Sequence, residues 1–137
     1  MKTTLDLVDI LWTFLSGSAV KDEITGGIFK HIRPVNSDKE DVVINSLPNV
    51  NKDLAEAVCN VNVFVPNKSQ LLNGVQDKSQ PDSARLKELA TLLSITLEDQ
   101  WGEDYNFDVQ QSVLIRDETS GGWYYNIRLN FYSINTH

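Results

Sequence analysis

The sequence is poor in the residues that build most catalytic and metal sites. It contains one cysteine, Cys59, and two histidines, His31 and His137, among 137 residues. A single cysteine excludes an intrachain disulfide framework and a cysteine-based zinc site, and the two histidines lack the spacing of a metal-ligating pair. No Gly-x-Ser-x-Gly, Walker or Gly-x-Gly-x-x-Gly motif is present. These absences predict a protein that is not an enzyme and that needs no metal and no cofactor.

Basic residues and long apolar runs are also scarce. Twelve Lys and Arg stand against 19 Asp and Glu, which gives a formal charge of −7. Such a chain lacks the basic surface that follows phosphates, which argues against direct nucleic-acid binding. The longest apolar stretch, residues 5–15, is interrupted by Asp6 and Asp9; a membrane span needs about 20 apolar residues, and a signal peptide needs a cleavage pattern that is missing here. We expect a soluble chain that starts at its mature N-terminus and is not secreted by a signal peptide.

Two segments have helical periodicity, in a chain whose 41% hydrophobic residues suffice for one domain over residues 1–137. Residues 5–15 are apolar on a wide arc, which favours burial on two sides, against a sheet and a neighbouring loop or subunit. Residues 82–101 form a longer helix with one apolar stripe, made of Leu86, Leu89, Ala90, Leu93 and Leu97.

Five segments have the composition or the alternation of β-strands. They comprise residues 28–33, 42–44, 56–65, 109–116 and 123–134. The glycine-bearing segment 117–122 joins the last two as a hairpin, and residues 66–82 form a long polar connection. The expected order is α-β-β-β-α-β-β. It predicts an α+β fold with an antiparallel or mixed sheet of about five strands and two helices packed on one face.

The last strand alternates between two kinds of side chain. Trp123, Tyr125, Ile127, Leu129 and Phe131 form a core face. The opposite face carries Tyr124, Asn126, Arg128, Asn130 and Tyr132 and contains no Lys or Glu. Tyr, Asn and Arg suit contact surfaces, whereas a solvated strand face usually carries long charged residues. We interpret this face as an interface, and the alternative is a second layer that a loop covers.

An acidic cluster follows the longer helix. Glu98, Asp99, Glu103, Asp104 and Asp108 lie within eleven residues that contain no basic residue. Their spacing fits no EF-hand loop, so a contact surface or a merely solvated helix end is favoured over a cation site.

These patterns together predict a head-to-tail interface between identical copies, in which basic residues of one copy meet the acids of the next. The candidate interface residues are Trp12, Phe14, Lys30, Arg33, Glu98, Asp99, Glu103, Asp104, Tyr124, Asn126, Arg128, Asn130 and Tyr132.

The pattern of elements also resembles a known family. An apolar helix over residues 5–15 precedes the segments 28–34 and 41–44, and a long strand, one long helix and a closing hairpin that ends at 124–132 follow. This order is similar to the small structural proteins at the head–tail junction of tailed bacteriophages, the tail-terminator or tail-completion type. The polar 66–82 connection departs from that scheme.

This resemblance implies an α+β subunit that assembles into a ring, commonly a hexamer, which terminates the tail tube and joins it to the head. The partners it implies are other copies of the chain, the tail-tube protein and head-completion proteins. The location it implies is the bacterial cytoplasm during assembly and then the virion of a phage or prophage.

Two other classes remain open from the residues alone. One is a monomeric acidic α+β adaptor that masks a basic protein partner, and the other is a small enzyme whose site assembles from residues that carry no motif. The oligomeric state in solution distinguishes the ring from the adaptor.

Overall fold

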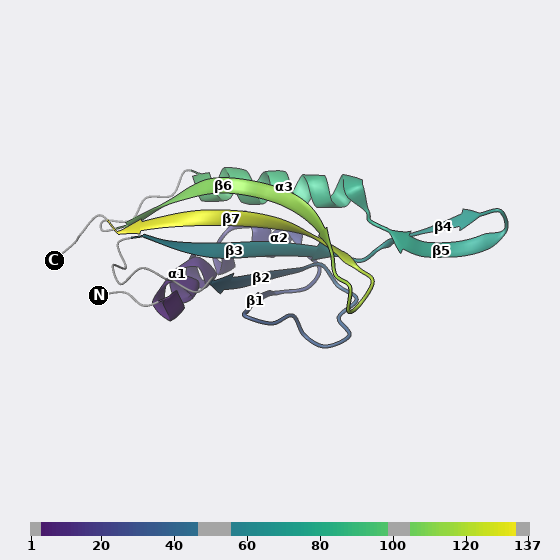
Figure 1. Cartoon of the computed structure of the whole chain (residues 1–137), viewed down its shortest axis with the longest axis horizontal. Coiled ribbons are helices and arrows are strands. Elements are labelled where there is room, and N and C mark those ends of the chain that lie inside the picture. The colour runs from purple at the N-terminus through teal and green to yellow at the C-terminus, as the bar shows by residue number, and fades with distance from the viewer. Residues whose placement is uncertain (1–3, 47–55, 99–104, 134–137) are drawn as a thin grey trace.

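A five-stranded mixed sheet organises the fold (Figure 1). The computed structural model describes residues 4–46, 56–98 and 105–133. In chain order the elements are α1 (Thr4–Ser16), α2 (Ala19–Glu23), β1 (Ile28–Lys30), β2 (Asp41–Ser46), β3 (Glu56–Val65), β4 (Lys68–Leu72), β5 (Val75–Gln80), α3 (Ser83–Glu98), β6 (Tyr105–Arg116) and β7 (Trp123–Ser133).

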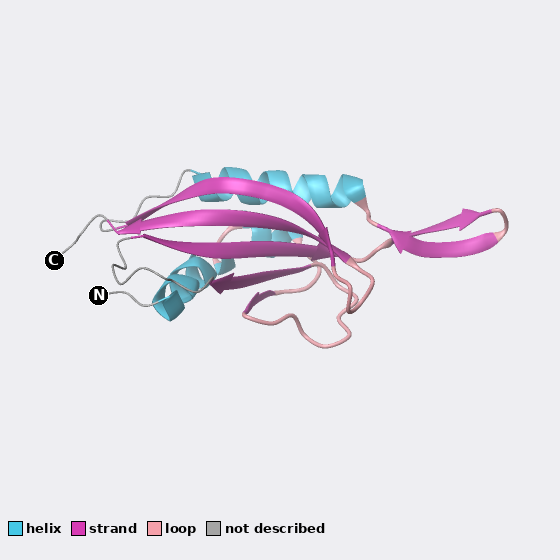
Figure 2. Ribbon diagram, in the orientation of Figure 1, coloured by secondary structure: helices cyan, strands magenta, loops and turns pink. Residues whose placement is uncertain are grey.

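The strand order in this sheet is β1-β2-β3-β7-β6. Strand β1 pairs with β2 in parallel, and the other neighbours are antiparallel. The predicted mixed α/β fold with a sheet of five strands is therefore confirmed. Strands β4 and β5 form a separate two-stranded sheet, which extends away from the rest of the molecule as an arm (Figures 1 and 2).

The core lies between the helices and one face of the sheet (Figure 2). Alternate residues of β3 and β7 enter it because successive strand residues point to opposite faces: Cys59, Val61 and Val63 from β3 and Ile127 and Leu129 from β7 are fully buried. The helices contribute one stripe each at helical spacing. The buried helical residues are Leu7, Val8, Leu11 and Leu15 of α1, Val20 of α2, and Leu86, Leu89, Ala90, Leu93 and Leu97 of α3.

The observed order of elements differs from the expected one in three places. The short helix α2 was not expected; Ser18 caps it by accepting a hydrogen bond from the Val20 N–H. The strand expected over residues 28–33 ends at Lys30, because His31 takes a left-handed conformation with φ of 72°. The connection expected over residues 66–82 contains β4 and β5.

A close approach between two loops sets the position of β1 beside β2. The Gly26 N–H donates to the Glu40 carbonyl over 2.8 Å, and the Gly27 N–H donates to Asp41 Oδ1 over 3.2 Å. A Cβ atom on Gly26 would overlap both the Glu40 carbonyl and the Asp41 carboxylate. Only glycine fits there without displacing the backbone.

Candidate functional site

The sheet face away from the helices carries a row of asparagines across three strands. The Asn126 Nδ2 group donates to Asn60 Oδ1 over 3.1 Å and to Asn62 Oδ1 over 2.6 Å. The Asn60 amide in turn donates to Asn45 Oδ1 over 3.0 Å. Cross-strand register places these residues opposite one another, since Asn62 pairs with Asn126 and Asn45 with Asn60. Asn60, Asn62 and Asn126 are buried, so Asn126 forms part of a bonded polar layer.

Aromatic and charged residues cover one end of this face. The rings of Phe64 and Tyr124 lie 4.8 Å apart, and the Arg33 guanidinium lies 4.7 Å from the centre of the Phe64 ring. Arg33 Nε is 2.8 Å from Asp41 Oδ2, and its Nη2 group donates to the Lys39 carbonyl. The segment between β1 and β2 therefore holds Arg33 over Phe64. At this end the sheet face is covered by a loop of the same chain, which was the alternative to an interface.

Arg128 lies on the same sheet face, beside the row of asparagines. It lies opposite Asn60 in the register of β3 and β7, and its side chain is half-buried. Its Nε atom is buried and has no hydrogen-bond partner among the residues that the structure describes. Asn130 is half-buried on the same face, and the side chain of Tyr132 is not among those described.

The candidate interface residues near the N-terminus lie where α1 packs beside β1. The Trp12 indole N–H donates to the Ile28 carbonyl over 2.8 Å. Lys30 Nζ forms an ion pair with Asp9 at 2.7 Å and lies 5.1 Å from the Trp12 ring. Phe14 is half-buried and packs against the core. Trp12 and Lys30 are exposed, but both are occupied by contacts within the chain.

The structure describes only some of the acidic candidate residues. Glu98 is exposed and ends α3, whereas Asp99, Glu103 and Asp104 lie outside the described residues. Whether these acids form a contact surface therefore stays a prediction.

Sequence reasoning missed the β4–β5 arm, although its turn had a signal. Asn73 and Gly74 have φ of 51° and 79°, and they join Leu72 to Val75, which pair directly. Asn-Gly between two apolar residues is the strongest short hairpin pattern, because both turn positions need positive φ. The flanking Lys, Ser, Gln and Asp residues led instead to the interpretation as a loop.

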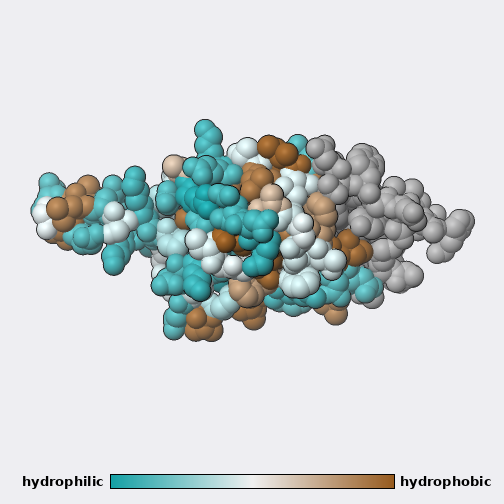
Figure 3. All heavy atoms as spheres, turned by 180° about the vertical axis from the view of Figure 1, so that it is seen from behind, coloured by the Kyte–Doolittle hydropathy of each residue, from teal (hydrophilic) through white to brown (hydrophobic). Residues whose placement is uncertain are grey.

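The arm has an apolar tip that is open to solvent. Leu71, Leu72 and Val75 are 69%, 48% and 66% exposed, and Figure 3 shows hydrophobic atoms gathered at the free end of the arm. The base of the arm is tied to the body. The Asn67 side-chain amide donates to the carbonyls of Lys78 and Gly121, and the Trp123 indole N–H donates to the Ser79 carbonyl.

A groove of about 390 Å³ runs between α3 and β6. Leu86, Ala90 and Ile95 line it from the helix, and Leu114 and Tyr125 line it from the sheet. Ile95 is 58% exposed and Leu114 is 39% exposed, so α3 does not cover the helix-facing side of β6 completely. The groove borders an edge of the sheet, because β6 is the last strand in its order.

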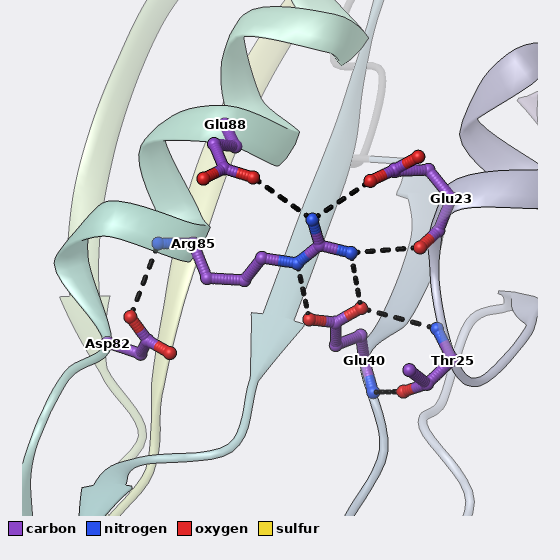
Figure 4. Close-up of polar contacts among 6 residues, drawn as sticks. All are labelled: Glu23, Thr25, Glu40, Asp82, Arg85 and Glu88. Atoms are coloured by element: carbon purple, nitrogen blue, oxygen red, sulfur yellow. Dashed lines mark hydrogen bonds and ion pairs between the residues drawn. The ribbon is translucent and has the colours of Figure 1, made fainter.

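One charged cluster connects α3 to the segments around α2 and β2 (Figure 4). Arg85 Nε and Nη2 donate to the two oxygens of Glu40 over 2.6 and 3.0 Å. Arg85 also donates to the carboxylates of Glu23 and Glu88 and to the Glu23 carbonyl. The Arg85 hydrogen bonds lower the pKa of Glu40, and the carboxylates raise the pKa of Arg85. The Arg85 guanidinium is paired with three carboxylates of the same chain, which indicates a structural role.

The described residues offer little for catalysis or metal binding. Cys59 is fully buried, and its burial raises the pKa of the thiol to about 12. No group of three or more His, Cys, Asp and Glu side chains within 4–46, 56–98 and 105–133 could hold a metal ion. In the same ranges, no helix combines the length and the apolar character that crossing a membrane requires.

No protein-family model matches the sequence, and no curated protein matches it significantly.

Proposed function

We propose that the chain is a structural subunit that assembles with copies of itself into a ring at the head–tail junction of a tailed bacteriophage. In this role the ring terminates the tail tube and joins it to the head, and the protein has no catalytic activity. The junction role rests on the element pattern described above, and the self-assembly rests on the surfaces of the fold.

The observation that carries the proposal is the arm. A two-stranded hairpin is marginally stable in water unless something packs on it. Here the arm ends in three exposed apolar side chains, Leu71, Leu72 and Val75. Its base is nevertheless fixed to the body by hydrogen bonds from Asn67 and Trp123. An apolar tip held in a defined direction suits a subunit that inserts it into a partner.

The sheet provides two further surfaces that favour contact with another chain. Residues 112–115 of the edge strand β6 contain no charged residue and no proline, although such residues usually protect an edge from pairing. On the sheet face away from the helices, Arg128 is half-buried, so part of its side chain can still contact another chain. Contacts of an arm with a different surface on the next copy are head-to-tail, and such contacts close into rings when the rotation permits.

Arg128 is the main basic residue in the proposed contacts between copies. Lys30 and Arg33 pair with Asp9 and Asp41 of the same chain, so they contribute less to contacts between copies. We propose that Arg128 meets acids of the neighbouring subunit, among which the exposed Glu98 is a candidate. Since surface ion pairs are screened by salt, the ring should weaken as ionic strength rises.

The experiment compares Arg128→Glu with Arg116→Glu, an exposed arginine at the end of β6. Light scattering at low and high salt measures the mass, and negative-stain electron microscopy scores binding to tail tubes of the phage or prophage that encodes the chain. We expect rings and capped tube ends for the wild type and for Arg116→Glu, and loss of both for Arg128→Glu. A wild type that neither self-associates nor binds tubes at any salt concentration contradicts the proposal.

A second candidate is the monomeric acidic adaptor. The in-chain pairing of Lys30 and Arg33 favours it, because a chain of formal charge −7 then presents few free cations. A stable monomer that binds a basic protein, with an affinity that falls steeply with salt, would identify this function.

A further inference from the structure

We infer that the apolar tip of the β4–β5 arm inserts into the α3–β6 groove of a second copy of the chain. This inference rests on the proposed self-assembly and names the two surfaces that meet. The donor surface consists of Leu71, Leu72 and Val75, and the acceptor surface is the groove bordered by Ile95 and Leu114.

The arm cannot fill the groove of its own chain. It points away from the body (Figures 1 and 3), and its base is held there by the bonds of Asn67 to Gly121 and of Trp123 to Ser79. β5 has six residues, which correspond to a reach of about 20 Å. The tip is therefore placed where another molecule can receive it.

The groove is long enough to receive an extended segment of another chain. The groove follows α3 from Ser83 to Ile95, a length of about 18 Å at the rise of an α-helix. Its volume of about 390 Å³ lies in the range of sites that enclose small ligands. Leu72 and Val75 are direct partners in the hairpin register and share a face, whereas Leu71 faces the other way. The tip therefore presents apolar atoms on both faces.

Charge favours the same partner. Residues 68–80 contain two lysines and one aspartate, a net charge of +1, which leaves −8 on the remainder of the chain. A basic arm is attracted to the acidic body of another copy. Lys87 is the one charged residue that lines the groove, and the neighbouring edge at residues 112–115 is uncharged, so the attraction comes from the acidic body as a whole and not from the groove lining.

Cysteine cross-linking tests this contact, because the natural Cys59 is fully buried and does not compete. Leu72→Cys and Ile95→Cys place thiols on exposed positions of the tip and the groove. A disulfide requires Cα atoms within about 7 Å. We expect mild oxidation of the double variant to give a reducible ladder of covalent multimers. A mixture of the two single variants should give dimers and no ladder, because each copy then carries half of the contact.

Matched controls use another exposed apolar residue. Val35, in the segment between β1 and β2, is more exposed than either test position; Val35→Cys with Ile95→Cys should give no ladder. In a separate series, Leu72→Asp should weaken self-association by at least about tenfold, corresponding to about 1.4 kcal/mol, whereas Val35→Asp should leave it unchanged. Dimers from Leu72→Cys alone that form as readily as mixed dimers would overturn the inference, because they indicate contact between tips.

The outcomes separate this inference from the proposed function. Rings or capped tail tubes without a link between positions 72 and 95 refute the arm contact and leave the proposed function standing. A ladder from a protein that never caps tail tubes supports the arm contact and contradicts the junction role.

Discussion

Replacement of Arg85 by methionine tests whether the charged cluster holds α3 against the segments around α2 and β2. Methionine keeps the unbranched apolar stem and removes the guanidinium. The Glu40 side chain is only 11% exposed and loses both of its short bonds to Arg85, whereas Glu23 and Glu88 are 54% and 68% exposed. Removing one partner of a buried pair costs about 3–5 kcal/mol, and exposed pairs contribute about 0–1 kcal/mol each. Because Arg85 itself is 22% exposed, we expect a loss of about 2–4 kcal/mol at pH 7.

The pH dependence of this loss distinguishes the ion pair from simple packing. Arg85 lowers the pKa of Glu40, so the pair stabilises the fold above about pH 4.3, the ordinary pKa of a glutamate. This contribution is lost as the pH falls through the lower pKa of the folded state. The difference between wild type and Arg85→Met should therefore shrink at acid pH.

Chemical denaturation at pH 7 and at acid pH, with a linear extrapolation to water, measures both effects. Glu88→Gln is the matched control, and it should cost less than about 0.5 kcal/mol because its carboxylate is exposed. The reasoning is refuted if the free energy of unfolding of Arg85→Met at pH 7 lies within about 0.5 kcal/mol of the wild-type value. A difference that small is what an exposed ion pair contributes.

Four further predictions concern the core, one loop, the buried thiol and the metal content. Leu93→Ala should lower the free energy of unfolding by about 2–5 kcal/mol, since Leu93 is fully buried; unchanged denaturation would mean that another face of α3 enters the core. Gly26→Ala should lower it by about 1–3 kcal/mol through overlap with Asp41, whereas Gly122→Ala, in the exposed turn before β7, should cost less in the same denaturation assay. The Cys59 thiol should react with a chromogenic disulfide only after unfolding, because it is fully buried and its pKa is raised to about 12. Elemental analysis of the untagged protein should find no stoichiometric zinc, iron or manganese.

Much of the fold could be predicted because burial leaves a periodic trace in the sequence. The structure buries the whole predicted stripe that ends at Leu97. In the alternating last strand it buries Ile127 and Leu129, whereas Trp123 and Tyr125 are half-buried. Local conformation was harder to predict. The strand expected over residues 28–33 ends early because His31 adopts positive φ, and a non-glycine residue gives little warning of that choice.

The candidate site was less predictable because it depends on side chains from distant segments. The alternation of β7 placed Asn126 on a face opposite the core, but the sequence did not show that Asn60 and Asn62 satisfy its amide. Likewise, the sequence suggested that Lys30 and Arg33 were free cations. In the fold they form ion pairs with Asp9 and Asp41. The arm could have been found from Asn73-Gly74, but its projection from the body depends on tertiary contacts at its base.

The mass of the wild-type protein in solution tests the central claim, self-assembly, most directly. Sedimentation velocity should be measured over a range of protein concentrations at low and at high salt, with and without tail tubes. The account predicts a discrete species whose mass is an integer multiple of 15.5 kDa and whose population grows with concentration and falls with salt. A single species of 15.5 kDa under every condition, with no association with tubes, would contradict it.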